Sequence, residues 1–168
     1  TSPADTLIHF EKLLKNVQPW SAESPYLYTL VINTTDRNGR VEESVAQPFG
    51  FRTVEMKNGQ LLVNGVAITI KGVNRQEHNA VHGRTLSIGE MVKDVKMMKQ
   101  FNINAVRTSH YPNYSEWYQL CDKYGLYMVG EANIECHGIL DTEYKQLADR
   151  EDWYPAFHDR MYRMIKRD

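Results

Sequence analysis

The sequence predicts an α/β fold, namely part of a (β/α)8 barrel, preceded by strands of an antiparallel β-sandwich. From Ala67 onward, strand-like and helix-like segments alternate with a repeat of about 30 residues, which is typical of βαβ units and a parallel sheet. Each predicted strand in this part ends in polar side chains, as barrel strands do at the active-site mouth. The chain before residue 56 has a different character, because it contains short strands separated by turn residues.

The composition is that of an ordinary globular protein and excludes several classes of function. The 168 residues are 42% hydrophobic and 24% charged. A formal net charge of -1 gives no electrostatic reason to expect nucleic acid or an anionic membrane as a partner. No apolar run approaches the roughly 18 residues of a membrane span. Two cysteines without a CxxC pair indicate neither a disulfide framework nor a structural zinc site.

The N-terminal residues show no targeting segment. The stretch "TSPADTLIHFEKLL" lacks the basic start, apolar centre and small-residue cleavage site of a signal peptide. Because we expect the chain to be a piece of a longer protein, this leaves the compartment open between cytoplasm and periplasm.

The first part of the chain predicts β-hairpins. Residues 26–33, "YLYTLVIN", and residues 41–51, "VEESVAQPFGF", flank "TTDRNG", in which Asp and Gly supply turn chemistry. The pairs Asn58-Gly59 and Asn64-Gly65 then divide the next stretch into short hairpin-like strands. We therefore expect a fragment of an antiparallel sandwich that leads into another domain.

The second part predicts the alternation of strands and helices. A strand over residues 67–73 precedes a helix that begins at Ser87 and Glu90, which fit the S-x-x-E capping box. The apolar stripe of this helix comprises Ile88, Met91, Val92, Val95, Met98 and Phe101. We interpret its methionines Met91, Met97 and Met98 as helix core.

The alternation then continues to the end of the chain. We expect a strand over residues 103–109 and a helix over 113–125 that Gly125 ends. A strand over 126–132 follows, and a further helix covers 152–168. The turn after the first of these strands, "GVNRQEHNAVHGR", has no G-x-G-x-x-G, so a barrel is favoured over a dinucleotide-binding sheet, with three of its eight strands present.

Polar side chains cluster where each strand of this part ends. The residues concerned are Asn74, Arg75, Gln76, Glu77 and His78 after the first strand, Arg107, Ser109, His110 and Asn113 after the second, and Glu131, Asn133, Glu135 and His137 after the third. Because the carboxyl ends of parallel strands meet at one edge, we expect a site there. Arg107 could equally be a structural arginine paired to an acid, and His110 could be an ordinary loop histidine.

Glu135 and His137 form a candidate metal pair. On an extended chain, side chains two residues apart leave the same side, whereas on a helix they would diverge. A carboxylate oxygen and an imidazole nitrogen can share a divalent cation if waters and another acid complete its shell. Zinc would need three or four protein ligands, so magnesium is the better candidate. The alternative is a salt bridge between a loop glutamate and a histidine.

Taken together, these motifs resemble the β-galactosidases of glycoside hydrolase family 2. The likeness rests on "KGVNRQEHN", "NAVRTSHYPN" and "YQLCDKYGLYMVGEANIECHG", preceded by "PYLYTLVI" and "GFRTVEM", and covers nearly the whole chain. The resemblance implies that residues 1–55 are the C-terminal part of an immunoglobulin-like β-sandwich domain. Residues 56–168 would be the N-terminal part of a (β/α)8 catalytic barrel, with its first three βα segments.

The resemblance also implies roles for particular residues. Glu135 and His137 match the family's magnesium ligands, so Mg²⁺ is the expected cofactor. His110 matches a histidine that contacts sugar hydroxyls, and Arg107 matches an arginine that orients the nucleophilic carboxylate. Asn133 matches a position that lines the same pocket.

Three positions depart from the family pattern. Gln76 stands where histidine usually follows "GVNR" and helps to bind a sugar hydroxyl, so galactose contacts are expected to differ. Gly130 stands where aspartate is common and Cys136 where threonine is common. Glu131, next to Gly130, matches a pocket-lining position with a less certain role.

The two catalytic carboxylates of this family are expected beyond residue 168. The acid/base glutamate belongs to an "N-E-S" segment on the fourth strand, and the nucleophile lies further on. A retaining glycosidase needs both, about 5 Å apart. We therefore expect the parent to be a retaining β-galactosidase that acts on β-galactosides and forms a homo-oligomer, and this chain alone to be inactive. The alternatives are a non-catalytic fragment that complements or oligomerises, or a family 2 β-glucuronidase or β-mannosidase.

Overall fold

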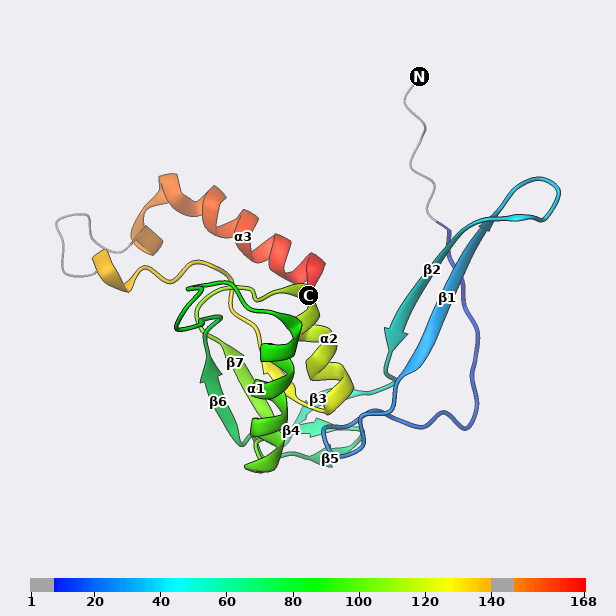
Figure 1. Cartoon of the computed structure of the whole chain (residues 1–168), viewed down its shortest axis with the longest axis horizontal. Helices are drawn as coiled ribbons and strands as arrows, with labels where there is room; N and C mark the ends of the chain where they lie inside the picture. The colour runs from blue at the N-terminus through cyan, green and yellow to red at the C-terminus, as the bar shows by residue number, and fades with distance from the viewer. Residues whose placement is uncertain (1–7, 140–146) are drawn as a thin grey trace, which may run out of the picture.

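The first structured element is a long antiparallel hairpin. The computed structural model describes residues 8–139 and 147–168, and in it β1 (Tyr28–Thr35) pairs with β2 (Val41–Phe49). The turn is held by Asp36, whose Oδ1 accepts the backbone N–H groups of Asn38 and Arg40 at 2.8 Å each. The hairpin projects away from the other elements (Figure 1). The predicted hairpin is thus confirmed.

A short antiparallel meander follows. It consists of β3 (Val54–Lys57), β4 (Gln60–Val63) and β5 (Val66–Ala67), in the order β3-β4-β5. Both Asn-Gly pairs have positive φ angles, 51° and 73° at the first pair and 53° and 76° at the second. Two successive positive φ angles are what a type I′ turn requires, and this confirms the prediction of short hairpin-like strands.

A three-stranded parallel sheet forms the centre of the second part. Its strands β6 (Gly72–Arg75), β7 (Ala105–Thr108) and β8 (Tyr127–Val129) lie in chain order. Within the described residues these strands do not close into a barrel. The first strand begins later than the predicted residue 67, because Val66–Ala67 continue the meander by pairing with β4. The third strand is also shorter than the predicted 126–132.

Of the two helices that connect these strands, the first begins and the second ends at the predicted capping residue, whereas the second begins at Ser115, two residues after the predicted start. Helix α1 (Ile88–Gln100) has the complete capping box of Ser87 and Glu90. Helix α2 (Ser115–Tyr124) ends at Gly125, whose φ of 76° lies in the left-handed region that favours glycine.

The core lies between the sheet and these two helices. Its fully or nearly fully buried members are Met91, Val95, Met98, Val106, Trp117, Cys121 and Leu126. The stripe predicted for α1 is therefore correct at its centre. The core assignment of Met97 is wrong, because this side chain is 58% exposed, and Ile88 and Phe101 at the helix ends are exposed as well.

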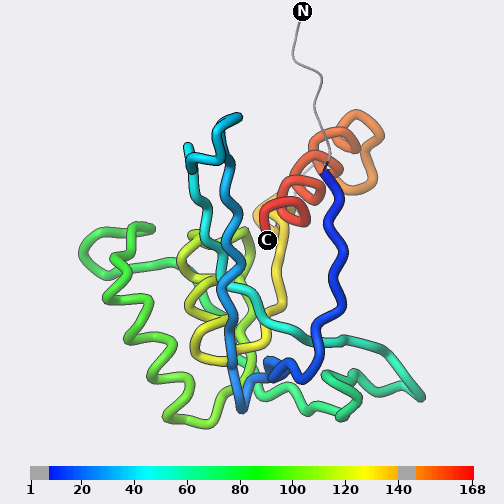
Figure 2. The backbone as a smooth tube through the Cα atoms, turned by 90° about the vertical axis from the view of Figure 1, so that its right-hand side faces the viewer, coloured from blue at the N-terminus to red at the C-terminus, as the bar shows by residue number. Residues whose placement is uncertain are grey.

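The last helix lies beyond the carboxyl ends of the parallel strands. In the part of the chain before it that the structure describes, three short 3-10 helices are η1 (His137–Ile139), η2 (Leu147–Asp149) and η3 (Glu151–Trp153). Helix α3 (Tyr154–Arg167) confirms the predicted final helix, and its C-terminal end lies beside the start of α2 in both views (Figures 1 and 2).

The segment before β1 docks against the α2 end of the parallel sheet. Trp20 is 2% exposed, and its indole Nε1–H donates to the carbonyl oxygen of Asp122 at 2.7 Å. Lys99 of α1 donates to the carbonyl oxygens of Ala22 at 3.0 Å and Gly125 at 2.9 Å. A Cβ atom on Gly125 would lie 2.2 Å from the Ala22 oxygen, so this close approach also requires glycine.

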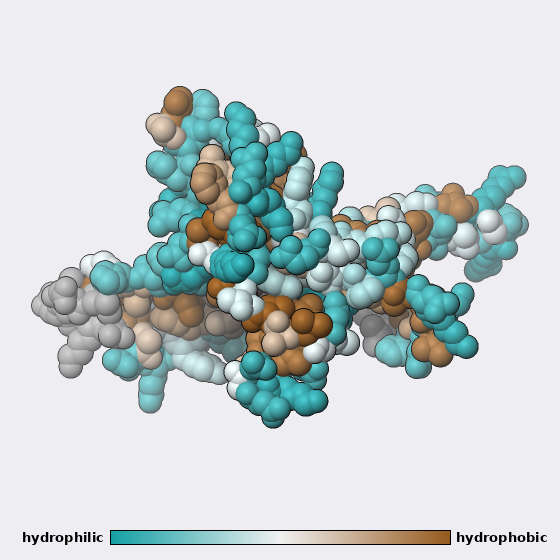
Figure 3. Space-filling model, turned by 90° about the horizontal axis from the view of Figure 1, so that it is seen from below, coloured by the Kyte–Doolittle hydropathy of each residue, from teal (hydrophilic) through white to brown (hydrophobic). Residues whose placement is uncertain are grey.

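Large apolar side chains remain on the surface of the meander and the hairpin. Seen from below, patches of apolar side chains stand between polar ones (Figure 3). Met56 and Val66 of the meander are 71% and 67% exposed. In the part of the chain that the structure describes, no helix has the length and apolar character needed to cross a membrane.

Candidate active site

The strand-end side chains sort onto two faces of the parallel sheet. Val73 and Val106 pack into the core under the helices, so the residues two positions later, Arg75 and Thr108, point to the same side and are buried. Arg107, one position earlier than Thr108, points to the opposite side and keeps 41% of its side chain exposed. The sheet thus separates a buried polar group from an accessible one.

The accessible group joins the second and third strands. It consists of Arg107, His110 and Glu131, and we call it the strand-end triad. The Arg107 Nε–H donates to one carboxylate oxygen of Glu131. The other oxygen lies 2.9 Å from Nδ1 of His110, and Nη2 of Arg107 lies 3.3 Å from the same nitrogen. The prediction that polar side chains of neighbouring strand ends meet is confirmed for these residues.

The backbone places Glu131 in this group. Its N–H donates to the Oγ1 of Thr108 at 3.1 Å, and Thr108 is fully buried at the end of β7. The chain that leaves β8 is therefore anchored to the neighbouring strand immediately before it presents the carboxylate.

The electrostatic environment keeps Glu131 ionised. Burial by itself would raise the pKa of this carboxyl, but the hydrogen bonds from His110 and Arg107 and the charge of Arg107 outweigh it and hold the pKa below its ordinary value. The triad therefore presents a carboxylate with two nitrogen partners at an accessible edge.

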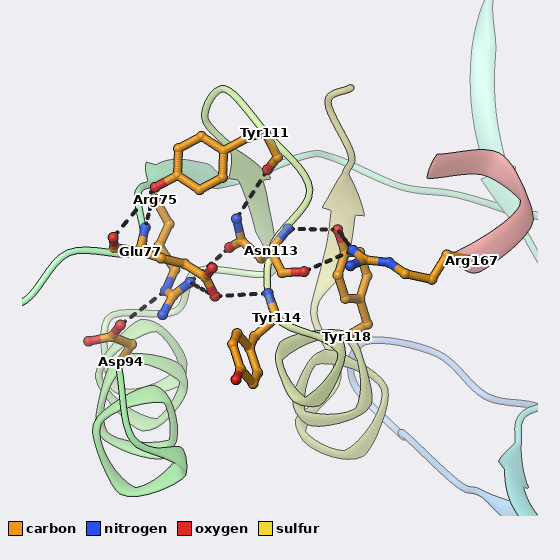
Figure 4. A network of polar contacts seen from close by, with 8 residues as sticks. All are labelled: Arg75, Glu77, Asp94, Tyr111, Asn113, Tyr114, Tyr118 and Arg167. Carbon is orange, nitrogen blue, oxygen red and sulfur yellow. Dashed lines mark hydrogen bonds and ion pairs between the residues drawn. The ribbon is translucent and has the colours of Figure 1, made fainter. Parts of the chain in front are cut away.

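The buried group is centred on Arg75 (Figure 4). Its guanidinium donates through Nε to Asp94 Oδ2 at 3.0 Å and through Nη1 to Asn113 Oδ1 at 2.8 Å. The same guanidinium lies 3.6 Å from the ring centre of Trp117, which is a close cation–π contact. Glu77 lies 3.7 Å from Nη1 and accepts the backbone N–H of Tyr114 at 3.0 Å.

Three residues expected at the mouth therefore lie elsewhere. Arg75, Glu77 and Asn113 are 6%, 8% and 1% exposed, and they bond to one another or to the loop after β7. Because the side-chain period of a strand is two, Arg75 faces the helices instead of the accessible side. These residues hold the loop that carries His110, and their part is structural.

Asn113 also connects the sheet to the last helix. Its carbonyl oxygen accepts from Arg167 at 2.8 Å, and its backbone N–H donates to the Tyr118 hydroxyl at 3.0 Å. Burial and the neighbouring Asp168 carboxylate raise the pKa of Tyr118 to about 12, so this phenol stays protonated as a donor.

The candidate metal pair lies on the segment after Glu131. Glu135 and His137 are exposed, with the Nδ1 of His137 at 3.9 Å from the Glu135 carboxylate, which also accepts the His137 backbone N–H at 2.7 Å. Asn133 is exposed too, whereas Ala132 is buried and Ile134 half-buried, as the alternation predicts. Within residues 8–139 and 147–168, no three acidic, histidine or cysteine side chains gather into a metal cluster.

The remaining predicted site residue stands apart from the triad. Gln76 follows β6 and is exposed to solvent. The hydrogen bonds among the described residues do not connect it to Arg107, His110 or Glu131. The structure thus brings together polar side chains at the ends of β7 and β8, whereas Gln76, after β6, is exposed at the surface.

Comparison with known proteins identifies the family. Residues 54–168 match the family described as glycosyl hydrolases family 2, TIM barrel domain, and residues 1–52 match glycosyl hydrolases family 2. The chain belongs to glycosyl hydrolase family 2. The resemblance found in its motifs is thereby confirmed.

Curated relatives of this chain are named β-galactosidase. The chain is 48% identical over 166 residues to a protein named β-galactosidase from Psychromonas ingrahamii, and 50% identical over 155 residues to one from Alteromonas mediterranea. These matches cover 99% and 92% of the chain but only 16% and 15% of the relatives. The chain thus spans less than a fifth of the length of the β-galactosidases it resembles.

Solved structures agree at the level of the family. A β-glucuronidase from Ruminococcus gnavus in complex with D-glucuronic acid has a TM-score of 0.66 and 35% identity, covering 69% of this chain and 20% of that protein. A β-glucuronidase from Bifidobacterium dentium complexed with coumarin-3-O-glucuronide has a TM-score of 0.68 and 34% identity, covering 70% and 19%.

Sequence reasoning underestimated one residue. Glu131 was placed near the pocket without a definite role, yet it is the residue that both Arg107 and His110 contact. The alternation of polar residues from Glu131 to His137 contained the signal, because it puts Glu131 on the accessible side directly after β8.

Proposed function

We propose that this chain is part of a retaining β-galactosidase that hydrolyses terminal β-D-galactosides. The observation that carries the proposal is the identity of 48–50% to β-galactosidases across nearly the whole chain. The accessible triad at the carboxyl end of parallel strands supports it, because that is the end at which barrel enzymes build their sites. The acid/base and nucleophilic glutamates would lie outside this chain.

The triad residues would act on the substrate and on the nucleophile. His110, with 36% of its side chain exposed, would contact sugar hydroxyls. Arg107 would orient the nucleophilic carboxylate. A guanidinium has five N–H donors, and the one on Nε bonds to Glu131, so further donors are available for this role. Gln76 and Asn133, both exposed, would line the sugar site. These contacts would stabilise an oxocarbenium-like transition state.

A magnesium ion would be held by Glu135 and His137. Their oxygen and nitrogen atoms are accessible and close to each other, and Mg²⁺ accepts few protein ligands together with waters. When bound, it would supply positive charge that positions and tunes the acid/base group. A further acidic ligand would come from outside the described residues.

The wider architecture belongs to the same proposal. Residues 56–168 would form the first three βα segments of a (β/α)8 barrel, and residues 1–55 would end an immunoglobulin-like sandwich. Among the described residues no strand pairs with the outer edge of β8, and this edge and the exposed apolar side chains of the hairpin fit a chain that pairs with more protein. The complete enzyme would be a homo-oligomer.

The test compares substrates and chain lengths. The full-length protein that contains this chain is expected to hydrolyse a nitrophenyl β-D-galactoside faster than the matching β-glucuronide or β-mannoside. Preference for the glucuronide or the mannoside would reassign the substrate within the family. The 168-residue chain alone is expected to be inactive, and turnover above a buffer blank would refute that part.

A second candidate function is a non-catalytic module. A chain with an open sheet edge could complement another piece of enzyme or associate with its own copies. Light scattering distinguishes this behaviour, because a compact, stable monomer would argue against it.

A further inference from the structure

We propose that Glu131 is a positioning residue that sets both the orientation and the tautomer of His110. The proposal rests on the proposed function for its effect on turnover, and on the geometry of the strand-end triad for the tautomer itself. It gives a role to a carboxylate that is neither of the two catalytic carboxylates.

The first step is the identity of the protonated nitrogen of His110. Its Nδ1 lies 2.9 Å from a carboxylate oxygen of Glu131 and 3.3 Å from Nη2 of Arg107. A carboxylate only accepts and a guanidinium only donates, so the same Nδ1 cannot bond to both.

The shorter contact decides between them. An unprotonated Nδ1 would place its lone pair against an ionised carboxylate at 2.9 Å, whereas an Nδ1–H makes a charge-assisted hydrogen bond there. The Arg107 guanidinium is already held by Glu131 through its Nε–H, so its position does not depend on the longer contact of Nη2 with Nδ1. We therefore assign the proton to Nδ1.

The second step is what this assignment leaves at the other nitrogen. In a neutral imidazole with Nδ1–H, Nε2 is a hydrogen-bond acceptor, and its lone pair points away from Nδ1 and Glu131. His110 is thus prepared to accept a hydrogen bond from a hydroxyl group of a sugar. The opposite tautomer would present a donor at the same place.

The third step is the rigidity of Glu131 itself. Both its oxygens are engaged, one by Arg107 and one by His110, and its backbone N–H is tied to buried Thr108. One carboxylate therefore couples two side chains whose roles are different. Replacing it disturbs His110 even though nothing else in the loop is altered.

A double-mutant cycle on the full-length protein tests the coupling. Glu131→Gln is expected to lower kcat/KM by about 10- to 100-fold, the range found where a carboxylate orients a metal-bound histidine. In a His110→Gln background the same change is expected to cost several-fold less than in the unaltered protein, because only its contact with Arg107 remains to be lost. Equal losses in both backgrounds would overturn the proposal. Glu43→Gln, the same chemical change on exposed β2, is the matched control and should leave kcat/KM unchanged.

A nitrogen NMR measurement tests the tautomer without any turnover. With ¹⁵N-labelled histidine at mildly alkaline pH, His110 is expected to show a pyrrole-like Nδ1 and a pyridine-like Nε2, assigned by their loss in His110→Gln. Glu131→Gln is expected to remove this preference. A pyridine-like Nδ1 in the unaltered protein would overturn the proposal, whether or not the variant folds. If the tautomer is as expected but β-galactosides are not hydrolysed, the proposed function fails and the positioning of His110 stands.

Discussion

Two arginines on neighbouring strands have opposite environments. Arg75 at the end of β6 is buried against Trp117 with Asp94 and Asn113 as partners, whereas Arg107 on β7 is 41% exposed with Glu131. In the parallel register Asn74 is opposite Arg107, so the two arginines are offset by one residue. That offset puts one guanidinium under the helices and the other on the accessible side. Strand parity thus decides which strand-end polar residue supports the fold and which can serve a site.

Replacement of the buried arginine should destabilise the fold most. Arg75→Met should destabilise the chain by about 3–5 kcal/mol, because buried Glu77 and Asn113 lose their partner and half-exposed Asp94 loses its ion pair. The same change at the exposed arginine, Arg107→Met, should cost no more than about 1 kcal/mol. Urea unfolding of both variants measures the difference. Equal losses would show that the two environments are not distinct.

The next effect concerns the loop that the buried group supports. Asn113→Ala should destabilise by about 1–3 kcal/mol, since it removes the acceptor of Arg75 Nη1 and a donor to the carbonyl oxygen of Tyr111. His110→Ala, three residues earlier and accessible, should be much milder in the same unfolding experiment. A larger loss at His110 than at Asn113 would contradict the division into a structural and an accessible group.

On the accessible side, the ionisation of Glu131 makes the free energy of unfolding depend on pH. The folded-state pKa of Glu131 is depressed by its nitrogen partners, so its contribution to stability is fully present above the unfolded-state value. It is lost as the pH falls through the folded-state value. The free energy of unfolding should therefore decline in acid less steeply in Glu131→Gln than in the unaltered chain. If urea titrations give parallel pH profiles of the unfolding free energy for the two proteins, the ionisation of Glu131 does not contribute to stability.

A substitution at Gln76, which among the described residues is not hydrogen-bonded to the strand-end triad, should change stability least. Gln76→His introduces the residue usual in the family, and at an exposed position the unfolding free energy should change by no more than about 0.5 kcal/mol. In the full-length protein KM for a β-galactoside should fall by about twofold to tenfold, the equivalent of one added hydrogen bond. An unchanged KM would indicate that this position does not reach the sugar.

Much of this architecture could be predicted from the sequence. The capping box at Ser87 and the left-handed Gly125 mark α1 and α2 because their signals are local. The start of β6 was predicted too early, since the choice of Val66–Ala67 to pair with β4 depends on a turn and a neighbouring strand. Strand edges are set by pairing partners, which a local pattern does not contain.

The candidate site was predicted in outline and not in detail. Polar strand ends are visible in the sequence, and Arg107 and His110, both predicted at the end of the second strand, lie close together there. Which of them faces inward depends on the strand register, so Arg75 and Asn113 were grouped with the wrong side. The role of Glu131 depends on its contacts with Thr108 and Arg107 of β7, and these contacts form only when the chain folds.

The contact of Trp20 and Ala22 with the helices has a practical consequence for dividing the gene. The two family segments meet in sequence at residues 52 and 54, yet the Trp20 indole, the Lys99 ammonium and the Asn64 amide hold them together in space. A barrel segment expressed from residue 54 onward would lose the cover over Asp122 and Gly125. A truncated protein that begins near residue 54 should therefore also include the stretch around Trp20, which keeps the α2 end well packed.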